Sequence, residues 1–142
     1  MTTSDLIIKA IKFAEKAHCG QLDDDNKNYF DTHLMPVMQI LSVLTDDHVT
    51  LCAAILHDTL EDTKTTYNEL VLEFGTEIAD LVNELTHDGK KDAKGYYFPR
   101  LRSEKAIMIK FADRLSNLSR MSSWPKKRRE QYLRKSKFWA SE

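Results

Sequence analysis

The chain has 142 residues, 42% of them hydrophobic and 30% charged, and its formal net charge at pH 7 is −1. This length buries a core without disulfides or structural metals, so we expect one domain over residues 1–142, and the composition excludes a disordered protein. No apolar run approaches the roughly 20 residues that span a bilayer, and the first residues lack the layout of a signal peptide. We therefore expect no membrane partner and a cytoplasmic address.

Apolar residues recur at helical spacing along most of the chain and do not alternate as they do in a strand, which predicts an all-α fold. The first helix has an apolar face that runs through residues 6–17, with Ser4 or Asp5 as its N-cap. A second helix carries Pro36 near its start. A third helix, capped by Asp46 or Asp47, ends at a His-Asp pair.

Further along the chain, residues 66–69 have the form of a capping box, in which a Thr hydroxyl and a Glu carboxylate satisfy free amides at a helix start. Gly75 suits the end of that helix, and Thr76 is expected to cap the next one. Residues 87–100 contain Gly and Pro and predict a long surface loop. A basic C-terminal helix is expected over about 124–139.

A sixth helix, expected from about Ser103 to Met121, carries two stripes of opposite character. Its predicted apolar side consists of Ile107, Phe111, Leu115 and Leu118. Its polar stripe consists of Lys110, Asp113 or Arg114, and Asn117. A polar stripe usually faces solvent. In the competing interpretation, Asp113 binds a metal ion, and Lys110, Arg114 and Asn117 bind phosphate oxygens and hydroxyls.

The most informative segment follows the apolar run LCAAIL and reads His57-Asp58-Thr59-Leu60-Glu61-Asp62. A His-Asp pair alone is weak evidence, because a surface pair would look the same. Glu61 and Asp62 follow Asp58 at i+3 and i+4, and would lie near it if the turn stays helical. Such a cluster of carboxylates and imidazole repels itself when it is partly buried, and a divalent cation is the simplest way to stabilise it.

These segments together resemble the HD-domain superfamily and, within it, the RelA/SpoT-type hydrolases of guanosine tetraphosphate, especially their short stand-alone members. The resemblance rests on HDTLEDT at 57–63, YNEL at 67–70 followed by Phe74-Gly75, and IKFADRLSNL at 109–118. It covers about residues 5–121. It implies a helical HD-domain fold and hydrolysis of the 3′-pyrophosphate of ppGpp or pppGpp, with one divalent metal ion, usually Mn²⁺.

The resemblance also implies roles for individual residues. The first metal ligand in the family pattern follows a Tyr and precedes a helix, and here it corresponds to His33, after Tyr29. The full set of implied metal ligands is His33, His57, Asp58 and Asp113. The family's acidic pair, which orients or deprotonates the attacking water, corresponds to Glu61 and Asp62. The positions near the bound nucleotide correspond to Lys110 and Asn117.

The chemistry of the donor set agrees with this assignment. Two neutral imidazoles and two carboxylates suit a borderline divalent ion such as manganese, iron, cobalt or zinc. Glu61 can act as a general base or hold the water in line, and Asp62 can support it or protonate the leaving group. Lys110 and Arg114 would offset negative charge on the phosphates.

The segment 22–27 departs from the family pattern, because relatives typically carry an Arg-Lys pair there and this chain reads Leu-Asp-Asp-Asp-Asn-Lys. Arg120 also stands where relatives often have a small hydroxyl residue. Two alternatives therefore stay open: an HD phosphohydrolase for another phosphorylated metabolite, and a nucleotide-sensing or nucleic-acid-associated module with the basic tail at 126–137. Glu61 and Asp62 argue against a mere binding module. We expect a small-molecule nucleotide as partner rather than a nucleic acid, and a homo-oligomer is compatible with the sequence.

Overall fold

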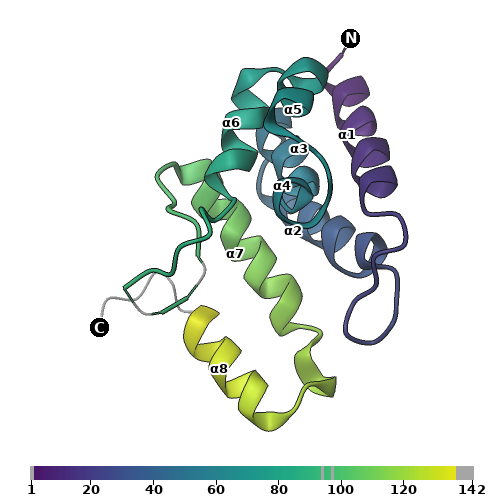
Figure 1. Cartoon of the computed structure of the whole chain (residues 1–142). Helices are drawn as coiled ribbons and strands as arrows, with labels where there is room; N and C mark the ends of the chain where they lie inside the picture. Colours follow the sequence, from purple (N-terminus) through teal and green to yellow (C-terminus); the bar gives the residue numbers. More distant parts are fainter. Residues whose placement is uncertain (1, 94, 97, 137–142) are drawn as a thin grey trace.

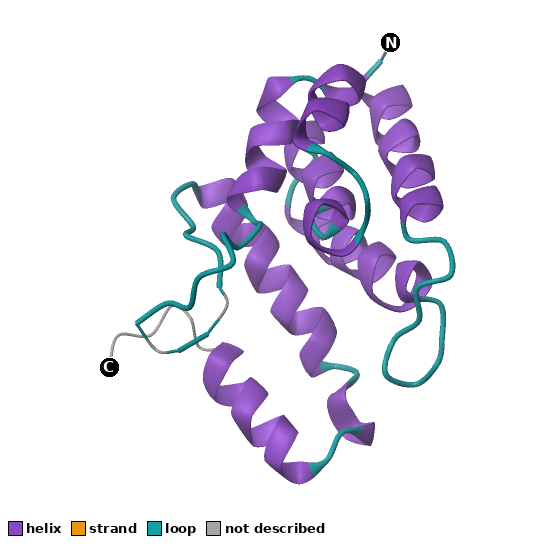
Figure 2. Ribbon diagram, viewed as in Figure 1, coloured by secondary structure: helices purple, strands orange, loops and turns teal. Residues whose placement is uncertain are grey.

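The computed structural model describes residues 2–93, 95–96 and 98–136. These residues form helices and loops, with an isolated bridge between Leu22 and Asn28 (Figure 2), which confirms the all-α prediction. The helices are α1 (Thr3–Ala17), η1 (Phe30–Leu34), α2 (Met35–Leu44), α3 (His48–Leu56), α4 (Thr59–Asp62), α5 (Tyr67–Phe74), α6 (Thr76–Glu84), α7 (Glu104–Leu118), η2 (Met121–Ser123) and α8 (Lys126–Ser136).

Side-chain caps define the starts of α1 and α3. The Thr2 hydroxyl accepts the Asp5 backbone N–H at 3.0 Å, and the Asp5 carboxylate accepts the Thr2 N–H at 3.2 Å, so Thr2 is the N-cap. The prediction of Ser4 or Asp5 as the cap was wrong, because the helix starts earlier than its apolar face. Asp47 caps α3, as predicted, by accepting the Thr50 N–H at 3.0 Å.

The junction between α5 and α6 turns at a single glycine. The predicted capping box of Thr66 and Glu69 is present at the start of α5. Gly75, with a φ of 88°, ends α5 and is also the residue that precedes α6. Thr76 is the first helical residue of α6 and its side chain makes no cap, so that prediction was wrong. The residue at the capping position is Gly75, which has no side chain that could accept a hydrogen bond.

Helix α3 lies at the centre of the fold (Figure 1). Every residue from Val49 to Leu56 is buried, and the helix packs against α1, α2, α6 and α7. A helix covered on all sides must be apolar around its whole circumference, which the sequence VTLCAAIL nearly achieves. The end of α3 is therefore buried as well, and it carries His57 into the interior.

The predicted apolar face of α7 was wrong. Ile107 and Leu115 are 37% and 53% exposed, whereas the buried side chains are those of Ala106, Ile109, Ala112, Asp113, Arg114 and Ser116. The small alanines allow close packing against the neighbouring helices, α2 foremost. The polar side chains point inward because they have hydrogen-bond partners there. The spacing of apolar residues in the sequence carries no information about such partners.

A short π-helical segment, η1, was not predicted. It runs directly into α2, and the Met35 backbone N–H donates to the Phe30 carbonyl in the wide π pattern. π-helical turns are frequent at functional sites because they redirect side chains from an otherwise regular helix. Here the segment carries His33, which is 1% exposed.

Helix α8 returns along α7 after the η2 turn (Figure 1). It begins after Pro125 and is described to Ser136, so the last part of the helix predicted over 124–139 lies outside the described residues. The predicted loop at 87–100 is confirmed for its described residues. Within the described part of the chain, no helix has the length and apolarity that crossing a membrane requires.

Candidate metal centre

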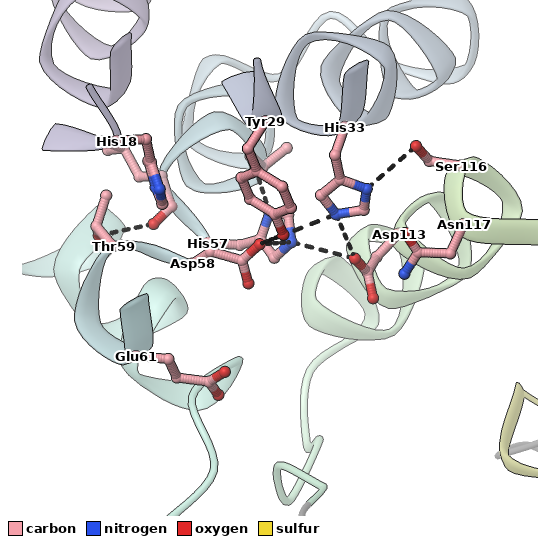
Figure 3. Close-up of polar contacts among 12 residues, drawn as sticks. His18, Tyr29, His33, His57, Asp58, Thr59, Glu61, Asp113, Ser116 and Asn117 are labelled. Carbon is pink, nitrogen blue, oxygen red and sulfur yellow. Dashed lines mark hydrogen bonds and ion pairs between the residues drawn. The ribbon is translucent and has the colours of Figure 1, made fainter. Parts of the chain in front are cut away.

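Four side chains that are far apart in the sequence converge where η1, the end of α3 and the middle of α7 meet (Figure 3). His33, His57 and Asp58 offer ligand atoms that all lie within 4.8 Å of one another. Asp113 lies against both imidazoles, with Oδ1 2.8 Å from His33 Nε2 and 3.3 Å from His57 Nε2. Asp58 Oδ2 is 3.3 Å from His57 Nε2 and 3.9 Å from His33 Nε2. The structure thus brings all four predicted ligands together.

The orientation of His57 is set by the backbone of its own helix. Its Nδ1 lies 2.6 Å from the Ala54 carbonyl oxygen, which can only accept a hydrogen bond. Nδ1 must therefore carry the proton, and in a neutral imidazole this leaves the Nε2 lone pair directed at Asp58 and Asp113. A histidine whose second nitrogen is bonded to a carbonyl is the usual arrangement at a metal site.

His33 has a more ambiguous environment. Its Nδ1 lies 3.2 Å from Ser116 Oγ and 2.9 Å from Arg120 Nη2. Nδ1–H can donate to the serine hydroxyl, which leaves Nε2 free to bind an ion. A guanidinium can only donate, so a bond from Arg120 requires the opposite tautomer. A hydrogen bond from Arg120 therefore favours the tautomer in which Nε2 carries the proton and cannot bind a metal ion.

Tyr29 holds the Asp58 carboxylate. Its hydroxyl donates to Asp58 Oδ2 at 2.5 Å, and its ring packs beside His33 with a centroid separation of 5.1 Å. The pKa of Tyr29 is raised by burial and by the nearby charge of Asp58, so the hydroxyl keeps its proton and remains a donor. The sequence identified Tyr29 only as a marker preceding His33, and did not predict this contact.

The electrostatics of the cluster favour a cation. Burial alone would raise the pKa of Asp113, but Lys110 and the two imidazoles hold it well below its usual value. Burial would likewise raise the pKa of Asp58, which His57 and His33 lower. For His57, burial lowers the pKa, but Asp58 and Asp113 outweigh it and raise it to about 9. The carboxylates of Asp58 and Asp113 thus stay ionised, and their negative charge stabilises positive charge beside them.

The residues fit a divalent ion. Two imidazole nitrogens and two carboxylate oxygens are the ligand types that first-row divalent metals accept, and the carboxylates neutralise the ion's charge. Lys110 Nζ lies 3.3 Å from Asp113 Oδ2 and leaves Oδ1 facing the histidines. His33, His57 and Asp113 are at most 6% exposed, so an ion bound there would be largely shielded from water by protein.

The predicted catalytic carboxylates follow Asp58 on α4 and differ in their partners. Glu61 Oε1 accepts the His87 backbone N–H at 2.8 Å, and its side chain stands apart from the imidazoles (Figure 3). The pKa of Asp62 is raised by burial and then by the Asp58 charge. Neither carboxylate is in the group of His33, His57 and Asp58, and Asp113 is placed beside that group by its contacts with the two imidazoles.

The predicted substrate-binding residues of α7 are less free than the sequence suggested. Lys110 faces Asp113 and lies 5.1 Å from the Phe98 ring centroid. Arg114 is 5% exposed, lies between the rings of Phe98 and Tyr132, and donates to the Tyr132 hydroxyl at 2.9 Å. Asn117 Nδ2 donates to the same hydroxyl at 2.7 Å. Arg114 and Asn117 thus anchor α8 to α7.

A pocket of about 420 Å³ opens beside the cluster, and its walls come from the loop between α1 and η1, from the end of α7 and from α8. Tyr29, through Asp58, and Arg120, through His33, connect it to the predicted metal ligands. Its other lining residues are Gln21, Leu22, Asp23, Asp24, Asn117, Trp124, Arg128, Tyr132 and Lys135. The only sequence signal for the α8 residues was the basic stretch at 126–137, which equally describes a solvated helix.

The chain matches known proteins in sequence and in fold. The family described as HD domain matches residues 10–93. The chain is 36% identical to the guanosine-3′,5′-bis(diphosphate) 3′-pyrophosphohydrolase MESH1 of Xenopus tropicalis, over 96% of this chain and 82% of that protein. It is 35% identical to the bifunctional (p)ppGpp synthase/hydrolase SpoT of Escherichia coli (strain K12), over 85% of this chain but 19% of SpoT.

A solved structure of a metazoan ortholog of SpoT, described as hydrolyzing ppGpp and playing a role in starvation responses, has the same fold. It superposes with a TM-score of 0.78 and 29% sequence identity, and the match covers 93% of this chain and 82% of the other. The similarity in sequence and the similarity in fold therefore extend over the same, nearly complete length of the chain.

Proposed function

This chain belongs to the HD domain family, and on that premise we propose that it is a metal-dependent hydrolase that removes the 3′-pyrophosphate of ppGpp and pppGpp. The observation that carries the proposal is that His33, His57 and Asp58 offer ligand atoms within 4.8 Å of one another, with the Asp113 carboxylate lying against both imidazoles. A relative of similar length, MESH1, bears the name of this activity.

The proposed ion is Mn²⁺, held by His33, His57, Asp58 and Asp113. The ligand set contains imidazole nitrogen and carboxylate oxygen, both of which Mn²⁺ accepts. When bound, such an ion lowers the pKa of a water molecule and polarises a phosphoryl oxygen. Lys110, which lies beside Asp113, supplies positive charge where the phosphates of the substrate would lie.

Glu61 and Asp62 are proposed to manage the proton transfers. The His87 amide fixes one oxygen of Glu61 and leaves the carboxylate able to orient or deprotonate a water molecule. The pKa of Asp62, raised by burial and by Asp58, lies closer to neutral pH than that of a free carboxyl, which suits a group that shuttles a proton to the leaving pyrophosphate.

A second candidate is an HD phosphohydrolase for a different phosphorylated metabolite. It is favoured by Asp23 and Asp24, whose carboxylates line the pocket in which a nucleotide would lie. Carboxylates repel additional phosphates, so a ligand with fewer phosphates would suit this wall better.

The test is an activity assay on the full chain loaded with Mn²⁺. Separate reactions contain ppGpp, pppGpp and ordinary nucleoside di- and triphosphates, and the products are separated by ion-exchange chromatography. Pyrophosphate and GDP from ppGpp are expected, with none from an Asp58→Ala control. Turnover of another phosphorylated compound alone would select the second candidate. Failure to turn over any of them would contradict the proposal.

A further inference from the structure

The acidic loop between α1 and η1 forms two ion pairs with the opposite wall of the pocket. We propose that one of its residues, Asp24, is a specificity-determining residue that occupies Arg128 and disfavours ligands whose phosphates extend into that wall. The inference rests on the proposed function, since it concerns the remote part of the same ligand. It assigns a role to the segment in which this chain departs from its family's pattern.

Hydrogen bonds within the loop close it into a turn. The Asp23 backbone N–H donates to the Lys27 carbonyl at 2.8 Å, and Asp23 Oδ1 accepts the N–H groups of Asp25 and Lys27 at 2.8 and 2.9 Å. The bridge between Leu22 and Asn28 closes its base. Asp24 is therefore held at a defined position beside the pocket.

Asp24 meets a guanidinium that is itself held in place. Asp24 Oδ2 lies 2.9 Å from Arg128 Nη2, and the side chains of both residues are 49% exposed. The Arg128 guanidinium stacks on the Trp124 ring, 3.9 Å from its centroid. Because the ring positions the guanidinium, Arg128 would present its donors to the pocket without Asp24 as well.

Arg128 lines two pockets, so its ion pair with Asp24 affects how a ligand binds there. Arg128 lines the pocket beside the metal centre and also a second pocket of about 440 Å³, which contains Lys135 and Tyr96. A phosphate that enters the first pocket from the metal side would meet Arg128, which lines both pockets. It must displace the Asp24 carboxylate before it can bond to Arg128, and an uncharged base or sugar need not.

The neighbouring ion pair acts in the same direction. Asp23 Oδ2 lies 3.6 Å from Arg120 Nη1, and the Asp23 side chain is 7% exposed. Both arginines that line the pocket, Arg120 before η2 and Arg128 on α8, are thus paired with a carboxylate from the loop. This charge balance lowers the attraction for a polyphosphate arm without removing the cations beside the metal centre.

The experiment compares two substrates that differ only at the remote end, ppGpp and guanosine 3′-diphosphate, which lacks the 5′ phosphates. In Mn²⁺-loaded wild type, kcat/KM for the two should be similar. Asp24→Asn should raise the ratio in favour of ppGpp by about fivefold, the scale of an exposed ion pair. The change should be in KM, because Asp24 does not touch the reacting groups.

Asp25→Asn is the matched control. Asp25 lies in the same turn, is exposed and forms no ion pair with the described residues, and its substitution changes the net charge equally. An equal rise in the ratio for this variant would mean that general charge, and not the pair with Arg128, is responsible. An unchanged ratio in Asp24→Asn would also overturn the proposal.

Arg128→Gln tests the partner. It should abolish the gain when it is combined with Asp24→Asn, and persistence of the gain would contradict the assigned pair. If the wild type hydrolyses neither substrate, the proposed function fails, but the inference remains testable by calorimetric binding. Asp24→Asn should then tighten binding of GDP relative to guanosine, and an unchanged relative affinity would refute it.

Discussion

Replacing Tyr29 by Phe should weaken metal binding while leaving the fold intact. The substitution removes one oxygen atom, whose hydrogen bond to Asp58 Oδ2 measures 2.5 Å, and keeps the ring that packs beside His33. A hydrogen bond to a charged group contributes about 1.5–3 kcal/mol, which corresponds to about tenfold to hundredfold in the dissociation constant. Loss of an outer partner of a metal ligand has effects of the same size.

The measurement is isothermal titration of metal-free protein with Mn²⁺ at fixed pH. Tyr67→Phe is a matched control, because Tyr67 also donates its hydroxyl to a carboxylate, that of Asp80, away from the metal centre. This control should bind Mn²⁺ as the wild type does. Equal affinities in Tyr29→Phe and wild type would refute the reasoning, since Asp58 would then be either no ligand or held without help from Tyr29.

Three further predictions concern the same site. The pKa of His57 rises from 6.5 to about 9, so its protonation stabilises the metal-free fold fully below pH 6.5. This contribution is lost as pH rises through 9, while the affinity for Mn²⁺ increases. Unfolding experiments on the metal-free protein and Mn²⁺ titrations, each at several pH values, would check these two changes. Arg120→Ser should tighten Mn²⁺ binding by less than about tenfold, because it removes the donor that competes for His33 Nδ1, and weaker binding would contradict this. Glu61→Gln should lower kcat by about 10²- to 10⁴-fold with undiminished metal content, as measured by single-turnover assays and elemental analysis.

The helical pattern and two of the caps were predictable from the sequence, because they depend on neighbours within a few residues. The Thr66–Glu69 box and the Asp47 cap are local hydrogen bonds, and they formed as predicted. The sequence did not predict which face of α7 points inward. Its alternation of apolar and polar stripes allowed either side to be buried, and partners on η1 and α8 decided for the side of Asp113.

Some of the predicted metal ligands could likewise be identified from a single segment, and one could not. The adjacency of His57 and Asp58, and the spacing of Lys110, Asp113 and Asn117, are properties of single segments. The choice of His33 came from the resemblance to a family, since nothing local distinguishes it from the chain's other histidines. The π-helical turn that directs it toward Asp113 depends on packing that no short window contains.

The sequence by itself thus determined the helical class, some of the helix starts and the types of donor that a metal ion would find. Only the tertiary structure decided which distant groups meet, because hydrogen bonds and ion pairs between segments require the whole chain to be packed. Tyr29 on Asp58, Tyr132 under Arg114 and Asp24 on Arg128 join residues that are 29, 18 and 104 positions apart. The last of these contacts explains how the acidic loop and the basic tail come to face each other across one pocket.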